Sequence, residues 1–185
     1  MNERRETMSE YGELIDDRTV RFERTLPGPI ERVWGYIVES DKRAKWLCAG
    51  NIGPGSDGDV DMHFHNATLS KAEDIARPEK YKDMPEELFF TGKVTRWEPP
   101  HAVSHIWDFE DESSEVCYEL EDLGDKVRLV LTHRRLESGD TILSVSGGWH
   151  THLNILADVL EGNEPRAFWE AHTRFEAEYE KRLGE

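Results

Sequence analysis

Alternating apolar and polar residues predict six β-strands in this chain. The first alternation spans residues 19–26 and ends at the Pro-Gly-Pro sequence that starts at Pro27. A second strand is expected at 60–65, after a loop rich in Gly and Pro. Four further segments show the same two-residue period, namely 88–97, 102–109, 114–120 and 126–134. Consecutive strands joined by short turns indicate an antiparallel meander.

Apolar side chains at steps of three and four residues predict the helices. A short helix is expected at 30–37, with a shorter turn at 41–46. Near the C-terminus a stripe indicates a long amphipathic helix, and its members are Ile142, Val145, Trp149, Leu153, Leu156 and Leu160. Gly147 and Gly148 lie within this stripe, and each costs about 1 kcal/mol of helix stability relative to Ala. They mark either a helix start after Ser146, which we favour, or a close approach of another backbone.

Two polar segments stand apart from this pattern. Residues 66–87 are charged and contain two prolines, so we expect a long excursion with one helical turn, placed between two strands as a candidate lid. After a break at Gly162, a last segment distributes its apolar residues among many charges, which predicts a second, more exposed helix. Its apolar members are Phe168, Phe175, Tyr179 and Leu183.

This order of elements defines an α+β chain of the helix-grip type, in which a curved antiparallel sheet wraps around a long C-terminal helix and two short helices follow the first strand. The chain has 185 residues and no internal repeat, which favours one core. We expect a flexible N-terminal segment at 1–17, the helix-grip domain at 18–162 and a helical extension at 163–185. A helix laid across a half-open sheet leaves a cavity between them.

The charge balance limits the partners. Lys and Arg number 23 against 39 Asp and Glu, a formal net charge of −16, so nucleic acid and anionic membrane surfaces are expected to be repelled. No stretch approaches the roughly 20 apolar residues of a membrane span, and the first residues lack the apolar core of a secretory signal. We therefore expect a cytoplasmic protein. Cys48 and Cys117 are the only cysteines and lack zinc-site spacing, so both are interpreted as reduced thiols.

The predicted strand at 60–65 carries a metal-like arrangement of side chains. Asp61, His63 and His65 share one face of this strand, and such a set can hold a divalent metal ion. The opposite face is apolar, however, so alternation directs these three side chains toward solvent. We interpret them as solvated edge residues and expect no metal and no cofactor.

Four segments in register carry a family resemblance: PGPIERVW at 27–34, GKVTRWEPP at 92–100 with Trp107 after it, VRLVLTH at 127–133 and GGWHTHLNIL at 147–156. From about residue 18 to 160 the chain resembles the START-like, Bet v allergen-like superfamily. Within it, the chain is similar to bacterial proteins that resemble the C-terminal domain of the activator of heat-shock protein 90 ATPase. The resemblance implies a shared cavity rather than a shared chemistry, because members include lipid binders, cyclases, dehydratases and chaperone cofactors.

The leading hypothesis is a protein that binds a small hydrophobic molecule between the sheet and the long helix. Strand alternation and the helical stripe direct apolar side chains into this space. The predicted pocket residues are Met62, Phe64, Phe90, His105, Trp107, Tyr118, Leu129, Leu131, His133, Trp149, Leu153 and Leu156. His150 and His152 flank the stripe and are expected near the rim of the pocket. No Ser-His-Asp order, phosphate loop or HExxH motif is present.

Two alternatives remain open. An enzyme of the cyclase or dehydratase kind would use His105, Tyr118 or His133 to move a proton, since these polar groups are predicted on the wall of an apolar pocket. Buried, satisfied side chains are the competing interpretation. An interaction module would bind a chaperone or other partner through its acidic surface. Separately, the resemblance implies a homodimer. For His101, in a turn, and His172, in a charged helix, we expect no chemistry.

Overall fold

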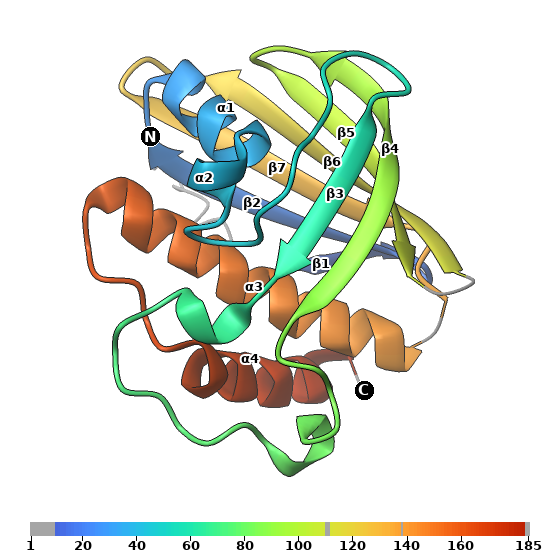
Figure 1. Ribbon diagram of the computed structural model, residues 1–185, viewed down its shortest axis with the longest axis vertical. Helices are drawn as coiled ribbons and strands as arrows, with labels where there is room; N and C mark the ends of the chain where they lie inside the picture. The colour runs from blue at the N-terminus through green and yellow to red at the C-terminus, as the bar shows by residue number, and fades with distance from the viewer. Residues whose placement is uncertain (1–9, 110–111, 138, 184–185) are drawn as a thin grey trace, which may run out of the picture.

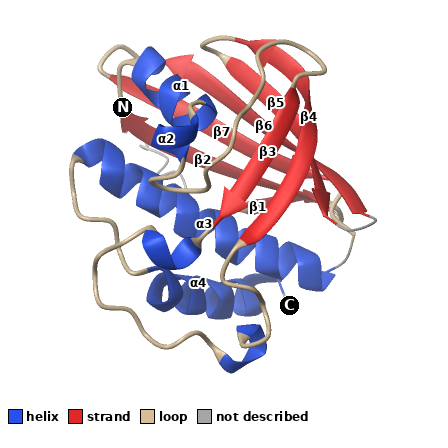
Figure 2. Cartoon of the chain, viewed as in Figure 1, coloured by secondary structure: helices blue, strands red, loops and turns tan. Residues whose placement is uncertain are grey.

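A seven-stranded antiparallel sheet forms the frame of the protein. The computed structural model describes residues 10–109, 112–137 and 139–183. The strands are β1 (Glu13–Asp16), β2 (Thr19–Pro27), β3 (Asp59–Phe64), β4 (Leu88–Glu98), β5 (Ala102–Phe109), β6 (Glu112–Asp122) and β7 (Lys126–Arg134). Their order across the sheet is β1-β2-β7-β6-β5-β4-β3. The sheet is curved and not closed, and its α+β architecture confirms the predicted helix-grip fold (Figure 2).

Helices cover the concave face of the sheet in two places (Figure 1). The helices are α1 (Ile30–Val38), α2 (Ser40–Arg43), α3 (Gly139–Glu161) and α4 (Phe168–Leu183), with single 3₁₀ turns at Asn66–Thr68 and Glu79–Tyr81. At one end of the sheet α1 packs against β6 and β7. Further along, α3 crosses the sheet, contacts β2 and packs along α4. None of the helices in the described ranges is long and apolar enough to cross a membrane.

The end of the sheet under α1 is filled with protein. Val33 and Ile37 of α1 are completely buried, and so is Trp46 in the segment that follows α2. The indole of Trp46 donates a 2.7 Å hydrogen bond to the backbone carbonyl of Tyr36, which fixes the ring. This end of the concave face therefore has a packed core, and open space can exist only toward its other end.

The ordered part of the chain begins earlier than predicted. We expected order to begin near Arg18, but β1 pairs with β2 along the outer edge of the sheet. The backbone N–H of Gly12 donates a 2.7 Å hydrogen bond to the hydroxyl of Tyr179 in α4. Because that partner lies 167 residues away in the sequence, no local pattern signals it. Residues 1–9 of the predicted flexible segment lie outside the described residues.

The predicted helix start after Ser146 is wrong. Both Gly147 and Gly148 lie inside α3, which runs from Gly139 to Glu161. A Cβ atom at Gly147 would lie 3.4 Å from the Cα of Glu176 in α4, so the glycine permits the two helices to approach closely. The alternative interpretation, a close backbone approach, is therefore the correct one.

As predicted, the last helix is more exposed than α3, but one face of it is buried. Four of its side chains form a stripe against α3, at most 7% exposed, and they are Phe168, His172, Phe175 and Tyr179. Phe175 stacks on His150 of α3 with ring centroids 3.8 Å apart, and the hydroxyl of Tyr179 lies 2.9 Å from Nδ1 of the same histidine. Through these contacts α4 packs against α3 and the rest of the fold.

Candidate functional site

A cavity of about 260 Å³ lies between the sheet, α3, α4 and the excursion at 66–87. Apolar and aromatic side chains form most of its wall: Leu47, Phe64, Tyr81, Met84, Leu88, Phe90, Trp107, Leu136, Val145, Trp149, Phe168 and Trp169. Polar side chains and one glycine complete it: Asn66, Ser114, His133, Arg135, Glu137, Thr141, Ser144, Gly148, His152 and His172. Apolar atoms make up most of the surface of this wall, which is typical of a small-molecule site.

The excursion at 66–87 is held against α4 and supplies part of the wall. Both carboxylate oxygens of Asp74 accept hydrogen bonds from the first backbone N–H groups of α4, at 2.7 Å from Trp169 and 2.9 Å from Glu170. The hydroxyl of Tyr81 donates to Oε1 of Glu176 at 2.6 Å. Asp74 therefore caps a helix that is distant in the sequence, and the cap places the excursion beside the cavity.

Five of the twelve predicted pocket residues line the cavity, and they are Phe64, Phe90, Trp107, His133 and Trp149. The rings of Phe64 and Trp107 stack with centroids 5.4 Å apart, and Trp149 meets Trp107 edge-on at 5.7 Å. The other seven are buried in the core away from the lining, namely Met62, His105, Tyr118, Leu129, Leu131, Leu153 and Leu156. Alternation identifies the face of a strand but not the position along it where packing leaves space.

His133 connects the sheet to α3 through both ring nitrogens. The indole Nε1 of Trp149 donates to Nδ1 of His133 at 3.0 Å, and Nε2 of His133 lies 2.8 Å from the Ser114 hydroxyl. An indole N–H can only donate, so Nδ1 carries no proton and Nε2–H donates to Ser114. That hydroxyl in turn donates to the backbone carbonyl of Trp107 at 3.3 Å. Burial lowers the pKa of His133 to about 3, which keeps the ring neutral.

His105 and Tyr118 lie behind the cavity wall, with ring centroids 6.1 Å apart. Nδ1 of His105 donates to the carbonyl of Ile106 at 3.0 Å, and burial lowers the pKa of this histidine to about 4. Burial likewise raises the pKa of the Tyr118 phenol. The structure therefore does not bring the three predicted proton-transfer residues together at the cavity, because only His133 lines it.

Two other histidines line the cavity instead. His152 of α3 is at its wall, and so is His172 of α4, for which we expected no chemistry. The signal for His172 was present in the sequence, because it continues the stripe of Phe168, Phe175 and Tyr179 at helical steps of four and three residues. The charges on the other faces of that helix obscured this stripe. His150, in contrast, packs between α3 and α4 and does not line the cavity.

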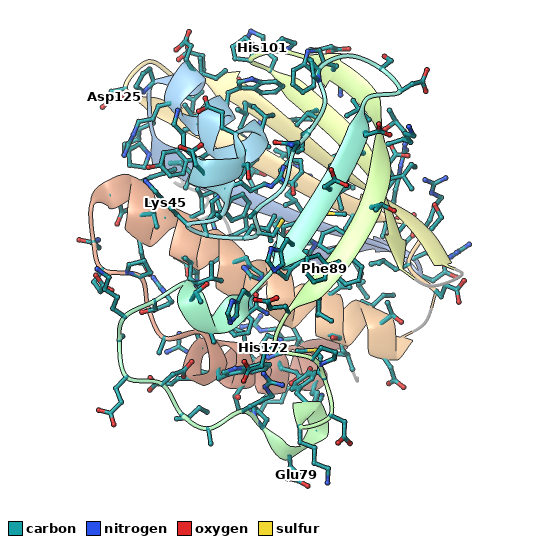
Figure 3. All side chains as sticks on the ribbon, in the orientation of Figure 1. Lys45, Glu79, Phe89, His101, Asp125 and His172 are labelled. Atoms are coloured by element: carbon teal, nitrogen blue, oxygen red, sulfur yellow. The ribbon has the colours of Figure 1, made fainter. Side chains whose placement is uncertain are left out.

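The metal-like set on β3 lies on the outer face of the sheet. His63 and His65 approach Glu87 at 3.5 Å and 3.4 Å, and each histidine side chain is about one-third exposed. His63 also stacks on Phe89, its exposed partner on the neighbouring strand β4 (Figure 3). Within the part of the chain that the structure describes, no group of three or more His, Cys, Asp or Glu side chains is placed to hold a metal ion.

A curved antiparallel sheet around a long C-terminal helix, with a cavity between them, defines the START-like, Bet v allergen-like class of helix-grip domains. The family model described as "Activator of Hsp90 ATPase homolog 1-like protein" matches residues 27–161. The chain belongs to this family, which confirms the resemblance seen in the sequence. No curated protein matches the chain.

Solved structures agree with this assignment. The protein encoded by gene BPP1335 from Bordetella parapertussis is 38% identical, with a TM-score of 0.78 over 95% of this chain and 91% of that chain. CalU16 from Micromonospora echinospora is 17% identical, with a TM-score of 0.66 over 90% of this chain and 89% of that chain. DynU16, a protein in the dynemicin biosynthetic locus, is 18% identical, with a TM-score of 0.62 over 81% of this chain and 49% of that chain. CalU16 and DynU16 share the fold.

Proposed function

We propose that this protein binds one small, predominantly apolar molecule in the cavity between the sheet, α3 and α4. The observation that carries the proposal is the cavity of about 260 Å³ with a mostly apolar and aromatic wall. The pocket is partly open to solvent, so a small molecule could enter it. A concave, mostly apolar wall with many aromatic rings is typical of small-molecule sites.

The arrangement of the wall supports binding over proton transfer at the predicted residues. Both nitrogens of His133 are already engaged by Trp149 and Ser114. For His133 to accept a proton at Nδ1, it would have to release the indole of Trp149. The same contacts hold α3 at a fixed height over the sheet, and a preformed wall lowers the entropic cost of binding.

The test is a panel of small apolar compounds, measured by the melting temperature and by tryptophan fluorescence. Trp107, Trp149 and Trp169 line the cavity, so a bound compound is expected to change the emission and to raise the melting temperature by mass action. A panel in which no compound changes either quantity would contradict the proposal.

Gly148 provides a matched variant that fills the cavity. It lines the space, and a Cβ atom added to it would meet nothing within 4 Å. We expect Gly148→Leu to fold at least as well as the original chain, since leucine favours helix more than glycine does, and to lose the response to the panel. An unchanged response in Gly148→Leu would place binding elsewhere and would overturn the proposal.

A further inference from the structure

Two buried histidines from different helices flank Phe168 at the cavity wall. The centroid of the His152 ring lies 5.2 Å from that of the Phe168 ring. The His172 ring stacks on the same phenylalanine, with centroids 5.5 Å apart. Each histidine is only 6% exposed and lines the cavity. The pair is therefore a polar element in an otherwise aromatic part of the wall.

In both rings Nδ1 faces the protein. Nδ1 of His152 donates a 2.8 Å hydrogen bond to the backbone carbonyl of Trp46. Nδ1 of His172 is buried without a hydrogen bond, and the nearest acid, Oε2 of Glu176, is 4.0 Å away. A carbonyl and a carboxylate both favour a proton on the nitrogen that faces them. A neutral imidazole with its proton on Nδ1 has an unprotonated Nε2, which can only accept a hydrogen bond.

The surroundings keep both rings neutral. Burial is the main cause that lowers the pKa of His152 to about 4; the hydrogen bond to the Trp46 carbonyl opposes it and the neighbouring His172 adds to it. Burial also lowers the pKa of His172, against the attraction of Glu176, and Lys80 of the excursion acts in the same direction as burial. Glu176 is occupied on Oε1 by Lys80 and Tyr81, so its charge is partly compensated. Among the described residues, neither Nε2 has a hydrogen-bond partner.

We propose that His152 and His172 make the cavity selective for apolar molecules that carry a hydroxyl group, whose O–H donates to Nε2 of one of these rings. The inference rests on the proposed function and adds the chemical class of the ligand. A ligand without a donor would leave a buried acceptor unsatisfied, which costs affinity. A methyl ether of the same shape has an oxygen but no proton to donate, so it distinguishes donation from simple polarity.

The experiment compares 2-naphthol, 2-methoxynaphthalene and naphthalene by isothermal titration calorimetry at neutral pH. We expect 2-naphthol to bind about tenfold more tightly than the other two, the effect of one buried hydrogen bond. If all three bind equally, the hydroxyl selectivity is wrong while the apolar site stands. If none binds, the proposed function fails and this inference fails with it.

Variants of the two histidines assign the effect to one ring. His152→Phe and His172→Phe each keep an aromatic ring beside Phe168 and remove one acceptor. In the variant that lacks the accepting ring, the preference for 2-naphthol is expected to fall about tenfold, to parity, while naphthalene binding is unchanged. His172→Gln retains an acceptor and is expected to restore part of the preference. His101→Gln, at the opposite end of the molecule (Figure 3), serves as the control and is expected to behave as the original chain. If both His172→Phe and His152→Phe keep the full preference, the proposal is overturned.

Discussion

The indole of Trp149 donates a 3.0 Å hydrogen bond to Nδ1 of His133, and this bond joins α3 to β7. It is the first of three hydrogen bonds in sequence, because Nε2–H of His133 donates to Ser114 and Ser114 donates to the carbonyl of Trp107. All members border the cavity. The chain of bonds thus fixes the tautomer of His133 and the separation of helix and sheet in which a ligand would lie.

Trp149→Phe tests this connection. Phenylalanine retains most of the ring but cannot donate, so Nδ1 of His133 is left buried and unsatisfied. We expect a loss of about 1–3 kcal/mol in the free energy of unfolding, measured by urea denaturation. The control is a double-mutant cycle with His133→Phe, in which the two losses are expected to be less than additive. Additive losses would show that the two side chains do not interact.

Stability is expected to fall as the pH drops below about 6.5. Burial lowers the pKa of His105 and His152 to about 4 and that of His133 and His150 to about 3. Between these values and the ordinary pKa of 6.5, the unfolded chain binds protons that the folded chain does not. The free energy of unfolding therefore has its full value above pH 6.5 and decreases as the pH falls. The decrease is at most about 1.4 kcal/mol per pH unit for each ring.

Urea denaturation at a series of pH values measures the slope of the free energy of unfolding against pH. His150→Phe supplies a comparison, because it removes one buried ring nitrogen, Nε2, that has no hydrogen-bond partner. Its slope below pH 6.5 is expected to be shallower than that of the original chain. An identical slope would mean that His150 titrates normally in the folded protein.

The cap on α4 is expected to control access to the cavity. Asp74→Ala removes both acceptors for the first N–H groups of α4, which we expect to cost about 1 kcal/mol and to loosen the excursion. A bound apolar compound should then dissociate faster in stopped-flow fluorescence. Asp74→Asn keeps one acceptor oxygen, so its dissociation rate should lie between those of the original chain and Asp74→Ala. Equal dissociation rates in all three proteins would exclude the excursion as a barrier.

A matched pair of glycine variants tests the helix contact. Gly147 faces the backbone of α4 at Glu176, whereas Gly148 faces open space. Gly147→Leu is therefore expected to push α4 away and to lower the melting temperature, while Gly148→Leu is expected to keep or raise it. Thermal unfolding of the two proteins measures the difference. Similar melting temperatures would contradict the close approach of the helices.

The sequence pattern was sufficient for the fold because each predicted strand and helix has a strong local period. β4 to β7 lie where alternation predicted them, and α1 begins at Ile30 as expected. The misjudged features depend on contacts between distant residues. Gly147 is unfavourable in a helix by local propensity, and only its contact with Glu176 explains why it is there. The excursion at 66–87 has no periodic pattern, because Asp74 holds it in place by binding to α4.

The candidate site was predicted only in part, for the same reason. Alternation placed Trp107 and His133 on the correct face. It could not show that α1 and Trp46 fill one end of that face, nor that α4 would bring His172 to the open end. The position of a cavity depends on which elements cover the sheet, and this is a property of tertiary packing.

An NMR titration of the indole N–H signals with an apolar compound that binds tests directly whether the ligand lies between the sheet, α3 and α4. The chain has six tryptophans, of which Trp107, Trp149 and Trp169 line the cavity. Trp34 and Trp97 pack against each other away from the lining. We predict saturable shifts of the three cavity signals with those of Trp34 and Trp97 unchanged. Shifts confined to Trp34 and Trp97 would contradict a ligand site between the sheet, α3 and α4.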